Sequence, residues 1–361
     1  MAEPAGPSVL VVLSSNARRG AEIEGHRLSQ ELTDAGVSAR AVALAPGSGE
    51  GARLDVPVLG ARPLSWRTLR ALRREARAVD VVLAYGSTTL PACALGLVGS
   101  RRPFVYRSIG DPAQWLRGRW HRERTGILMR RAAIVVPLWD EAAASIQQLY
   151  RLPASQIAVI PNARSVDEFR PPTSDERSAA RKSFGVDDDE ILAVVVGALS
   201  KEKRVDLAIR AVAELESVRL LVVGEGDCRT QLEKLGSEVL GERVAFTGTL
   251  TDVRPVYAAA DVLVLPSRTE GMPGVVVEAG LMGVPAAACD VGAMRWLMKH
   301  GVSGTLVSVD AEPPELAAAI TTALFASEPV QTLETSCSWA AAVAGWRQVI
   351  DKCAIRRSRD R

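Results

Sequence analysis

The amino-acid sequence predicts two doubly wound α/β domains joined by a hinge. The chain has 361 residues, about twice the common size of one domain. Short β-branched runs alternate with helical patterns in both halves, which is typical of parallel sheets with crossover helices. The alternation is interrupted at residues 161–190, where proline and charged residues replace the apolar runs. Because ligands of open α/β sheets bind at the carboxyl ends of the strands, we expect the functional site in the cleft between the two domains.

The individual strands are predicted from short apolar runs bounded by turn residues. In the first half they are Val9–Leu13, Ala39–Leu44, Val81–Tyr85, Phe104–Arg107, Ile134–Pro137 and Ile157–Ile160. Glu22–Ala35 and Trp66–Ala78 lie between them and have helical apolar spacing. In the second half the expected strands are Ile191–Val196, Leu220–Val223, Val244–Phe246, Val262–Leu265 and Ala286–Ala288.

These patterns divide the chain into four segments. Residues 1–165 are expected to form an N-terminal Rossmann-like domain, 166–190 a linker and 191–335 a C-terminal domain. Residues 336–361 contain a final helix with Ser338 as its N-cap. Trp339 and Trp346 lie on one face of this helix, and that is too much apolar surface to leave in water. We therefore expect the helix to cross back to the N-terminal domain; the alternative is that it covers the C-terminal domain.

Composition excludes several classes of protein. The formal net charge is only +2, so the molecule as a whole is not an obvious nucleic-acid binder. The five cysteines are scattered and form no C-x-x-C pair, which argues against a disulfide framework and a zinc site and fits a reducing cytoplasm. The first residues lack the basic region of a signal peptide. No apolar run approaches the ~18 residues that span a bilayer.

The strongest functional pattern is the segment DVLVLPSRTEGMPGVVVEAGLMG, from Asp261 to Gly283. A buried strand is followed by a short loop with Glu270 and then by a helix with Glu278 in an apolar run. A buried carboxylate needs a partner, and a ribose diol offers two hydroxyl donors. The expected helix opens with a stretch whose free N–H groups suit a phosphate; it consists of Met272, Pro273, Gly274 and Val275. In the alternative reading, Glu278 is a surface residue of a half-buried helix.

The segment E-G-M-P-G-V-V-V-E-A-G, with its E-x7-E spacing, resembles the signature of the retaining family 4 glycosyltransferases. The resemblance is strongest from Ile191 to Val307 and weaker before the linker. It implies the GT-B fold, with an N-terminal acceptor-binding domain and a C-terminal domain for the nucleotide sugar. It also implies that Glu278 binds the donor ribose and that Glu270 lies beside the donor sugar and the reacting face.

A second pattern, VVVGALSKEKRVDLAIRAVAEL, places Lys203 and Arg204 between a strand end at Gly197 and a helix. Cations at a helix N-terminus oppose the helix dipole, and a bound anion would offset that cost; the alternative is a solvated loop. The family pattern here is G-R-L-x-x-x-K-G, and its Arg and Lys grip the donor diphosphate. Lys203 matches the lysine, whereas Ala198 stands in place of the arginine. Either Arg204 replaces that arginine or the diphosphate is held less tightly.

Weaker patterns suggest further contacts. VAFTGTL resembles the family segment that faces the nucleotide base, so Thr249 and Leu250 are base-contact candidates. Gly20 and Ala21 resemble the family's glycine pair near the donor phosphates and acceptor, although a helix N-cap and turn explains them nearly as well.

Two positions depart from the family pattern. The family often has a histidine near the sugar at FVYRSIGDP, where this chain has none; three polar residues at this strand end are sugar or acceptor candidates, namely Arg107, Ser108 and Asp111. Trp296 stands where the family commonly has a glutamate.

The expected reaction is metal-independent sugar transfer with retention, from a UDP- or GDP-linked donor and with no cofactor. The leaving diphosphate can take the acceptor's proton if Lys203, Arg204 and helix-end amides stabilise its charge. Two alternatives stay open. A GT-B-like epimerase would need acid–base groups facing C2 of the sugar, and the shortage of histidine argues against it. An inactive nucleotide-binding partner subunit is compatible with the departures at Ala198 and Trp296.

The acceptor is not evident from the sequence. The stretch QWLRGRWHRERTGILMRR, residues 114–131, interleaves arginines with Trp115 and Trp120. Such a basic aromatic stretch can rest on anionic lipid headgroups at the inner membrane face; the alternative is a solvated helical face. A saccharide, a lipid-linked molecule or a small molecule therefore all remain as acceptors.

Overall fold

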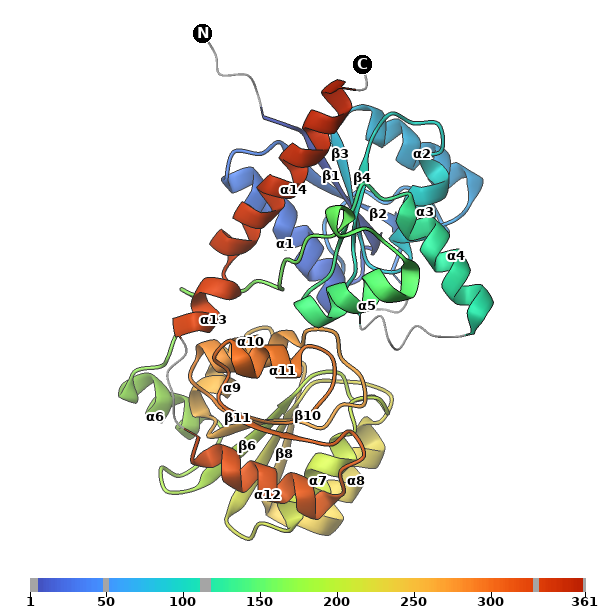
Figure 1. The fold of residues 1–361 in the computed structure, drawn as a ribbon. Helices are drawn as coiled ribbons and strands as arrows, with labels where there is room; N and C mark the ends of the chain where they lie inside the picture. The colour runs from blue at the N-terminus through green and yellow to red at the C-terminus, as the bar shows by residue number, and fades with distance from the viewer. Residues whose placement is uncertain (1–5, 48–51, 111–117, 327–330, 360–361) are drawn as a thin grey trace. The chain divides into compact units, whose positions relative to one another are not determined.

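A computed structural model describes residues 6–47, 52–110, 118–326 and 331–359 (Figure 1). The chain divides into two compact units. The N-terminal unit consists of Met1–Asn162 and Trp339–Arg361, and the C-terminal unit of Ala163–Ser338. Both units are parallel α/β sheets with helices on both faces, as the sequence predicts.

The described part of the N-terminal unit contains a five-stranded sheet in the order β2-β1-β3-β4-β5. Its strands are β1 (Val9–Ser15), β2 (Ala39–Ala45), β3 (Val81–Tyr85), β4 (Phe104–Arg107) and β5 (Ile134–Val136). Its helices are α1 (Gly20–Asp34), α2 (Trp66–Arg77), α3 (Thr89–Gly96), α4 (Arg119–Arg130), α5 (Asp140–Tyr150), the short η2 (Ala154–Gln156) and α14 (Trp339–Arg359).

Alternation along the strands assigns the helices of this unit to the two faces of the sheet. Leu10 and Val12 of β1 belong to the core cluster that includes residues of α2, α3, α4 and α5. Leu13 faces the opposite way and approaches α1, where a Cβ at Gly25 would lie 2.6 Å from it. Both α1 and α14 contact β3, so these two helices cover the second face.

Helix α14 packs within the N-terminal unit although it follows the whole C-terminal unit in sequence. Arg347 donates a hydrogen bond to the carbonyl of Ala35 at the end of α1, and Lys352 donates one to the carbonyl of Ser155. Trp346 is buried and Trp339 half-buried. The apolar side of the helix is therefore covered by the N-terminal sheet and α1.

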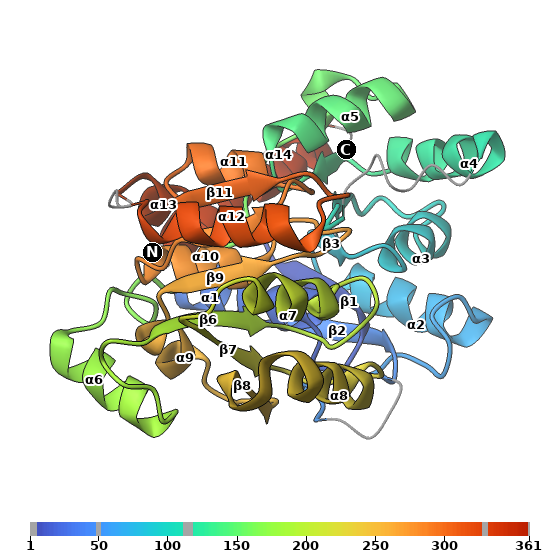
Figure 2. The ribbon, with the colours of Figure 1, turned by 90° about the horizontal axis from the view of Figure 1, so that it is seen from below.

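The described part of the C-terminal unit contains a six-stranded sheet in the order β11-β10-β9-β6-β7-β8. Its strands are β6 (Ile191–Val196), β7 (Val218–Val223), β8 (Val244–Gly248), β9 (Val262–Leu265), β10 (Ala286–Cys289) and β11 (Gly304–Val307). Its helices are α6 (Ser174–Ser183), α7 (Val205–Ala213), α8 (Arg229–Leu240), η3 (Gly241–Arg243), α9 (Arg254–Ala259), α10 (Gly274–Leu281), α11 (Met294–Lys299), α12 (Pro313–Leu324) and α13 (Gln331–Ser336). Helices α7, α8 and α12 cover one face of the sheet, and α9, α10 and α11 cover the other (Figures 1 and 2).

Two strand assignments differ from the sequence prediction. The expected strand Ile157–Ile160 forms only an isolated bridge, between Ile157 and Val135, because the chain leaves the sheet here on its way out of the N-terminal unit. Strand β11 was not expected. Its four residues begin with Gly304 and are only half-buried, so they lack the apolar run that identifies the other strands.

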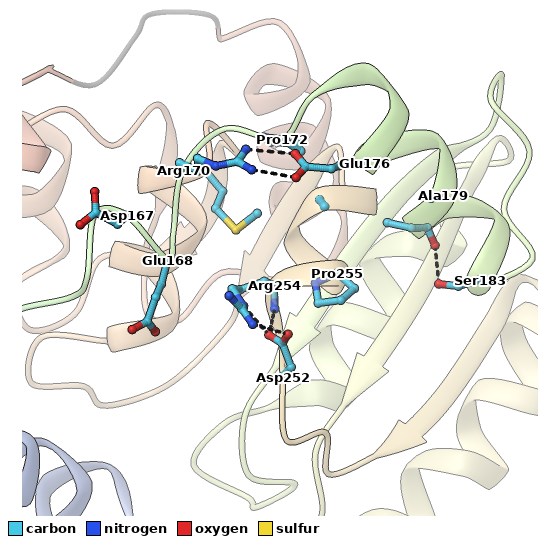
Figure 3. Close-up of a pocket in the computed structure, with 13 residues that line it drawn as sticks. Asp167, Glu168, Arg170, Pro172, Glu176, Ala179, Ser183, Asp252, Arg254 and Pro255 are labelled. Carbon is cyan, nitrogen blue, oxygen red and sulfur yellow. Dashed lines mark hydrogen bonds and ion pairs between the residues drawn. The ribbon is translucent and has the colours of Figure 1, made fainter.

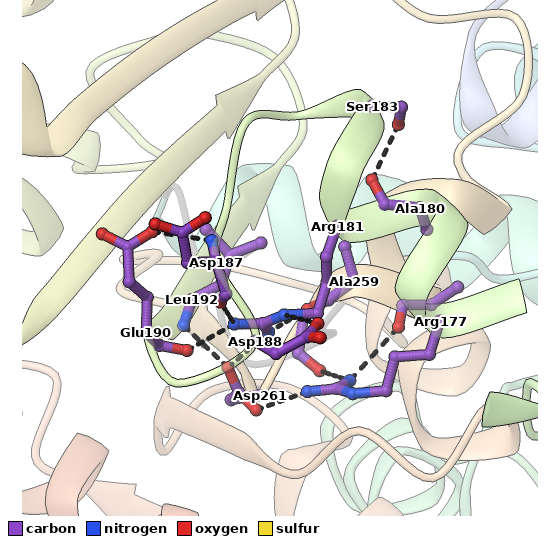
Figure 4. Close-up of polar contacts among 12 residues, drawn as sticks. Arg177, Ala180, Arg181, Ser183, Asp187, Asp188, Glu190, Leu192, Ala259 and Asp261 are labelled. Atoms are coloured by element: carbon purple, nitrogen blue, oxygen red, sulfur yellow. Dashed lines mark hydrogen bonds and ion pairs between the residues drawn. The ribbon is translucent and has the colours of Figure 1, made fainter. Parts of the chain in front are cut away.

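The expected linker, residues 166–190, is instead a folded part of the C-terminal unit. It contains α6, which begins with a capping box between Thr173 and Glu176 and packs against α9. Figure 4 shows Arg177 and Arg181 of this helix converging on Asp261. Their nitrogens lie 2.6 and 3.2 Å from its two carboxylate oxygens. Charged residues that led to the prediction of a linker therefore hold α6 in place.

Arg181 is the most buried member of this cluster, with a side chain only 3% exposed. Its guanidinium also donates hydrogen bonds to the carbonyls of Asp187, Glu190 and Ala259. Asp261 in turn accepts from the backbone N–H of Leu192 at 2.7 Å, at the start of β6. The cluster thus fixes α6 to the beginning of the central strand.

No helix in the described ranges is both long and apolar enough to cross a membrane.

We predict that Arg181→Met destabilises the protein by about 3 kcal/mol, because it leaves buried carbonyls without donors and removes one of two cations from Asp261. Chemical denaturation monitored by circular dichroism measures the change. The control is Lys182→Met, an exposed neighbour on the same helix, which should stay within about 0.5 kcal/mol of the wild type. Equal stability of the two variants would contradict the anchoring role.

Candidate active site at the carboxyl edge of the C-terminal sheet

An ion pair joins two loops at the carboxyl edge of this sheet. Lys203 lies between β6 and α7, and Glu270 lies between β9 and α10. The Lys203 Nζ is 2.6 Å from the Glu270 Oε1, and the side chains are 31% and 10% exposed. The two loops are also joined through backbone, because the N–H of Arg268 donates to the carbonyl of Glu202 at 2.8 Å. The structure thus brings together two residues that the sequence predicts to act on the same substrate.

Glycines at this edge allow unusually close approach of backbone. Gly197 and Gly224 follow the neighbouring strands β6 and β7 with positive φ, and a Cβ at Gly224 would lie 1.8 Å from the Gly197 carbonyl oxygen. A Cβ at Gly292 would lie 2.5 Å from the Glu270 carbonyl oxygen. Side chains at Gly224 and Gly292 would therefore displace the loops that carry the ion pair.

Helix α10 begins beside this pair. Pro273 is its N-cap residue, Met272 is buried, and Gly274 and Val275 are half-buried in the first turn. In the described structure the N–H groups of Gly274 and Val275 have no hydrogen-bond acceptor. Free N–H groups at a helix N-terminus are suited to an anion.

Glu278 has two protein partners, neither of which the sequence predicts. Its Oε1 accepts from Arg164 Nε at 2.6 Å, and its Oε2 accepts from the Tyr257 hydroxyl at 2.9 Å. Burial raises the pKa of Tyr257 well above its usual value, and Glu278 raises it further, so the phenol stays a donor. Each carboxylate oxygen retains a further lone pair for another donor.

Sequence reasoning missed both partners of Glu278. Arg164 lies 114 positions away and falls just before the expected linker. The one local signal is Gly274, since a Cβ there would lie 1.8 Å from an Arg164 nitrogen. Gly274 of the E-x7-E segment therefore leaves room for the guanidinium that donates to Glu278.

Arg204 does not join the ion pair, which argues against the alternative in which it replaces the arginine absent at Ala198. It stands at the N-cap of α7 with φ of 50°. Its guanidinium donates to the carbonyls of Val309 and Ala311, between β11 and α12. Two of its donors are thus committed to holding a loop.

Arg268 is a cation at this edge that sequence reasoning did not select. It is exposed, and its backbone bond to Glu202 places it beside the Lys203 loop. Burial raises the pKa of Cys289, and the charges of Arg204 and Arg268 oppose that rise. Arg268 therefore adds positive potential at the strand ends.

The base-contact candidates Thr249 and Leu250 follow β8 at the same edge of the sheet, exposed and half-buried respectively. Trp296 is buried and stacks on His300, with ring centroids 3.6 Å apart. The position that resembles the family's glutamate is therefore occupied by an aromatic core residue.

The candidates in the N-terminal unit fall into two groups. Gly20 and Ala21 form the first turn of α1, where Gly20 is exposed. Arg107 and Ser108 are each only 1% exposed, which argues against their expected role as sugar or acceptor contacts. Asp111 lies outside the described residues.

Arg107 has a structural environment that explains its burial. Its guanidinium donates to the carbonyls of Ile160 and Pro161 and to Asn162 Oδ1, the last at 3.0 Å. It also lies 5.7 Å from the ring centroid of Trp346 in α14. This cation therefore ties together the segment that leaves the N-terminal unit and the helix that returns to it.

A cavity of about 500 Å³ lies elsewhere in the C-terminal unit, between α6 and α9. Figure 3 shows that its arginines face carboxylates: Arg170 pairs with Glu176, and Arg254 pairs with Asp252, with shortest contacts of 2.7 Å. None of the predicted site residues lines it. Because both cations are already neutralised, we assign no function to this cavity.

Within the described ranges, no cluster of three or more His, Cys, Asp or Glu side chains has a geometry that could hold a metal ion.

Comparison with known proteins agrees with the fold. Residues 18–168 match the family model "Glycosyltransferase Family 4", and residues 190–325 match "Glycosyl transferases group 1". Together these matches cover most of the chain. The chain belongs to the glycosyltransferases that these two models describe.

Curated relatives are also glycosyltransferases. The α-D-kanosaminyltransferase of Streptomyces kanamyceticus is 31% identical over 60% of this chain and 55% of that protein. The D-inositol 3-phosphate glycosyltransferase of Mycobacterium marinum is 33% identical over 47% of this chain and 37% of that protein. The matched regions thus span about half or less of the length of these relatives.

Solved structures show the GT-B fold. Anabaena HepE, solved with UDP and glucose, has a TM-score of 0.74 at 21% identity and covers 98% of this chain and 99% of its own. WaaG, a glycosyltransferase involved in lipopolysaccharide biosynthesis, has a TM-score of 0.67 at 18% identity. The match covers 96% of this chain and 98% of WaaG.

We predict that Glu278→Gln lowers the free energy of unfolding by about 1.5–3 kcal/mol, because Arg164 loses its charged partner. Tyr257→Phe removes one neutral donor and should cost about 1 kcal/mol. Urea denaturation of both variants tests this ranking. A larger loss in Tyr257→Phe would show that the ion pair with Arg164 contributes less than the phenol.

Proposed function

We propose that the protein is a retaining, metal-independent glycosyltransferase that transfers a sugar from a UDP- or GDP-linked donor. The observation that carries this proposal is the Lys203–Glu270 ion pair at 2.6 Å beside the start of α10. The structures of HepE contain UDP in one case and UDP-glucose in another, which supports a nucleotide sugar as the donor here. We propose a saccharide, a lipid-linked molecule or a small molecule as the acceptor.

In this proposal the donor lies along the carboxyl edge of the C-terminal sheet. The free lone pairs of Glu278 accept the ribose hydroxyls, while Arg164 and Tyr257 hold its carboxylate in place. The diphosphate lies at the N–H groups that open α10 and at Lys203. Arg268 supplies the second cation, because the guanidinium of Arg204 is committed to backbone carbonyls.

The proposed reaction breaks the bond between the anomeric carbon and the donor phosphate oxygen. The acceptor hydroxyl oxygen bonds to that carbon on the same face, and its proton passes to an oxygen of the leaving diphosphate. Negative charge grows on the diphosphate as the bond breaks, and Lys203 stabilises it. Glu270 fixes the position of the ammonium before the reaction begins.

We further propose that the enzyme works in the cytoplasm at an anionic membrane surface. The free cysteines of the described chain support a reducing compartment. Helix α4 carries Trp120, which is 90% exposed, and Ile127, which is 56% exposed and two turns further along. Arginines flank both residues on the same helix. Aromatic and basic side chains together favour anionic lipid headgroups.

We predict that Lys203→Ala lowers the turnover of the donor by about 100-fold or more. It should weaken UDP binding by less than about 10-fold, because Lys203 acts on charge that develops in the transition state. Release of UDP or GDP from a panel of UDP- and GDP-sugars, with and without acceptors, measures turnover in EDTA. Lys201→Ala, an exposed neighbour, should retain activity. A strict need for Mg²⁺ or Mn²⁺ would refute metal independence. Donor consumption that never depends on an acceptor would favour an epimerase, and no donor consumption under any condition, despite nucleotide binding, would favour an inactive subunit.

We predict that the protein co-sediments with phosphatidylglycerol vesicles and not with phosphatidylcholine vesicles, and that Trp120→Ala reduces binding about 5-fold or more. Phe325→Ala is the control, since Phe325 is 83% exposed but lies in the other unit. Raising the salt concentration should weaken binding, because the arginines act by charge. Equal sedimentation of both variants would exclude α4 as the contact.

A further inference from the structure

A second cavity lies within the N-terminal unit, between α3 and α4, and it has features of a ligand site. Its volume is about 650 Å³. Leu90 and Leu95 of α3 and Leu128 of α4 form apolar walls, and Ser87, just after β3, contributes to the lining near the carboxyl edge of the sheet. An apolar pocket with a few polar groups is the usual form of a small-molecule site.

Tyr106 supplies the first polar group of this cavity. It lies on β4, is completely buried and lines the cavity, yet its hydroxyl has no hydrogen-bond partner in the described structure. Burial raises the pKa of Tyr106, and the nearby Tyr150 hydroxyl raises it further, so the group stays protonated. A buried hydroxyl without a partner costs free energy that a ligand oxygen would restore.

Arg124 and His121 supply the second polar feature. They lie one turn apart on α4 and line the same cavity, with Arg124 Nη2 3.3 Å from His121 Nδ1. Arg124 is exposed, and no carboxylate in the described structure lies within ion-pairing distance of it. A cation thus stands at the rim of a pocket whose interior is apolar.

We propose that this cavity binds the acceptor, and that the acceptor carries an apolar ring system with a hydrogen-bonding oxygen for Tyr106 and an acidic group for Arg124. The apolar part lies between α3 and α4. The inference rests on the proposed function only in naming the ligand as the acceptor, because the cavity and its groups belong to the N-terminal unit alone.

Binding of two fluorescent probes to the full chain tests the proposal without donor or transfer. The probe 2-naphthol offers an apolar ring system with a hydroxyl, and 6-hydroxy-2-naphthoate adds a carboxylate. Tyr106→Phe keeps the ring and should weaken 2-naphthol binding about 5-fold, the effect of about one net hydrogen bond. Tyr150→Phe is the matched control: its hydroxyl is also buried and unpartnered in the described structure, but Tyr150 is not among the residues that line the cavity. It should change the affinity less than about 2-fold.

The charge is tested separately. Wild-type protein should bind 6-hydroxy-2-naphthoate about 5-fold or more tightly than 2-naphthol, and Arg124→Gln should abolish that preference. Arg131→Gln, an exposed arginine just after α4 that does not line the cavity, should retain it. Circular dichroism melting curves check that each variant is folded.

Two outcomes overturn the proposal: no saturable binding of either probe, or equal losses in Tyr106→Phe and Tyr150→Phe. Failure of the proposed function looks different, since the protein would then bind neither UDP nor GDP while both probes still distinguish the variants. If instead the protein binds a nucleotide but neither probe, the cavity assignment fails and the donor site stands.

Discussion

The parallel direction of the strands is the constraint on which the site depends. In a parallel sheet, the loops that follow all strands gather at one edge. Strands β6 and β9 are neighbours in the C-terminal sheet, so the loops that follow them lie side by side although 67 residues separate Lys203 from Glu270. The glycines that follow β6 and β7 then let backbone approach backbone at that edge. Sheet order, rather than any local sequence, brings the ammonium to the carboxylate.

The sequence was sufficient for the fold class and for much of the site. Buried runs such as Val9–Leu13 and Val262–Leu265 are apolar along their length, so they could be recognised without knowledge of their neighbours. Glu270, Glu278 and Lys203 stand out because charged side chains at strand ends or in apolar runs need an explanation. Strand β11 was missed because it has no such local signal: Gly304–Val307 is short and half-buried.

Long-range partners were beyond sequence reasoning. Nothing near Arg164 or Tyr257 indicates that both donate to Glu278, because these residues lie 114 and 21 positions away from it. Arg107 was predicted to contact the substrate because it ends a strand. Its guanidinium instead donates to the carbonyls of Ile160 and Pro161 and lies over the ring of Trp346. The contacts of Arg204 could not be predicted for a similar reason, because the loop after β11 to which it donates is distant in sequence. A charged residue at a strand end can serve the scaffold as well as the substrate.

The N-terminal unit is built from two separate stretches of the chain. This arrangement affects the order in which the two units can fold during synthesis. Residues 163–338 are contiguous and leave the ribosome before α14 does, so the later half of the chain can complete its sheet first. Until Trp346 emerges, one side of Arg107 and the apolar surface of α1 and β3 stay uncovered. The N-terminal unit therefore cannot complete its native contacts until α14 has been synthesised, although it contains the first residues of the chain.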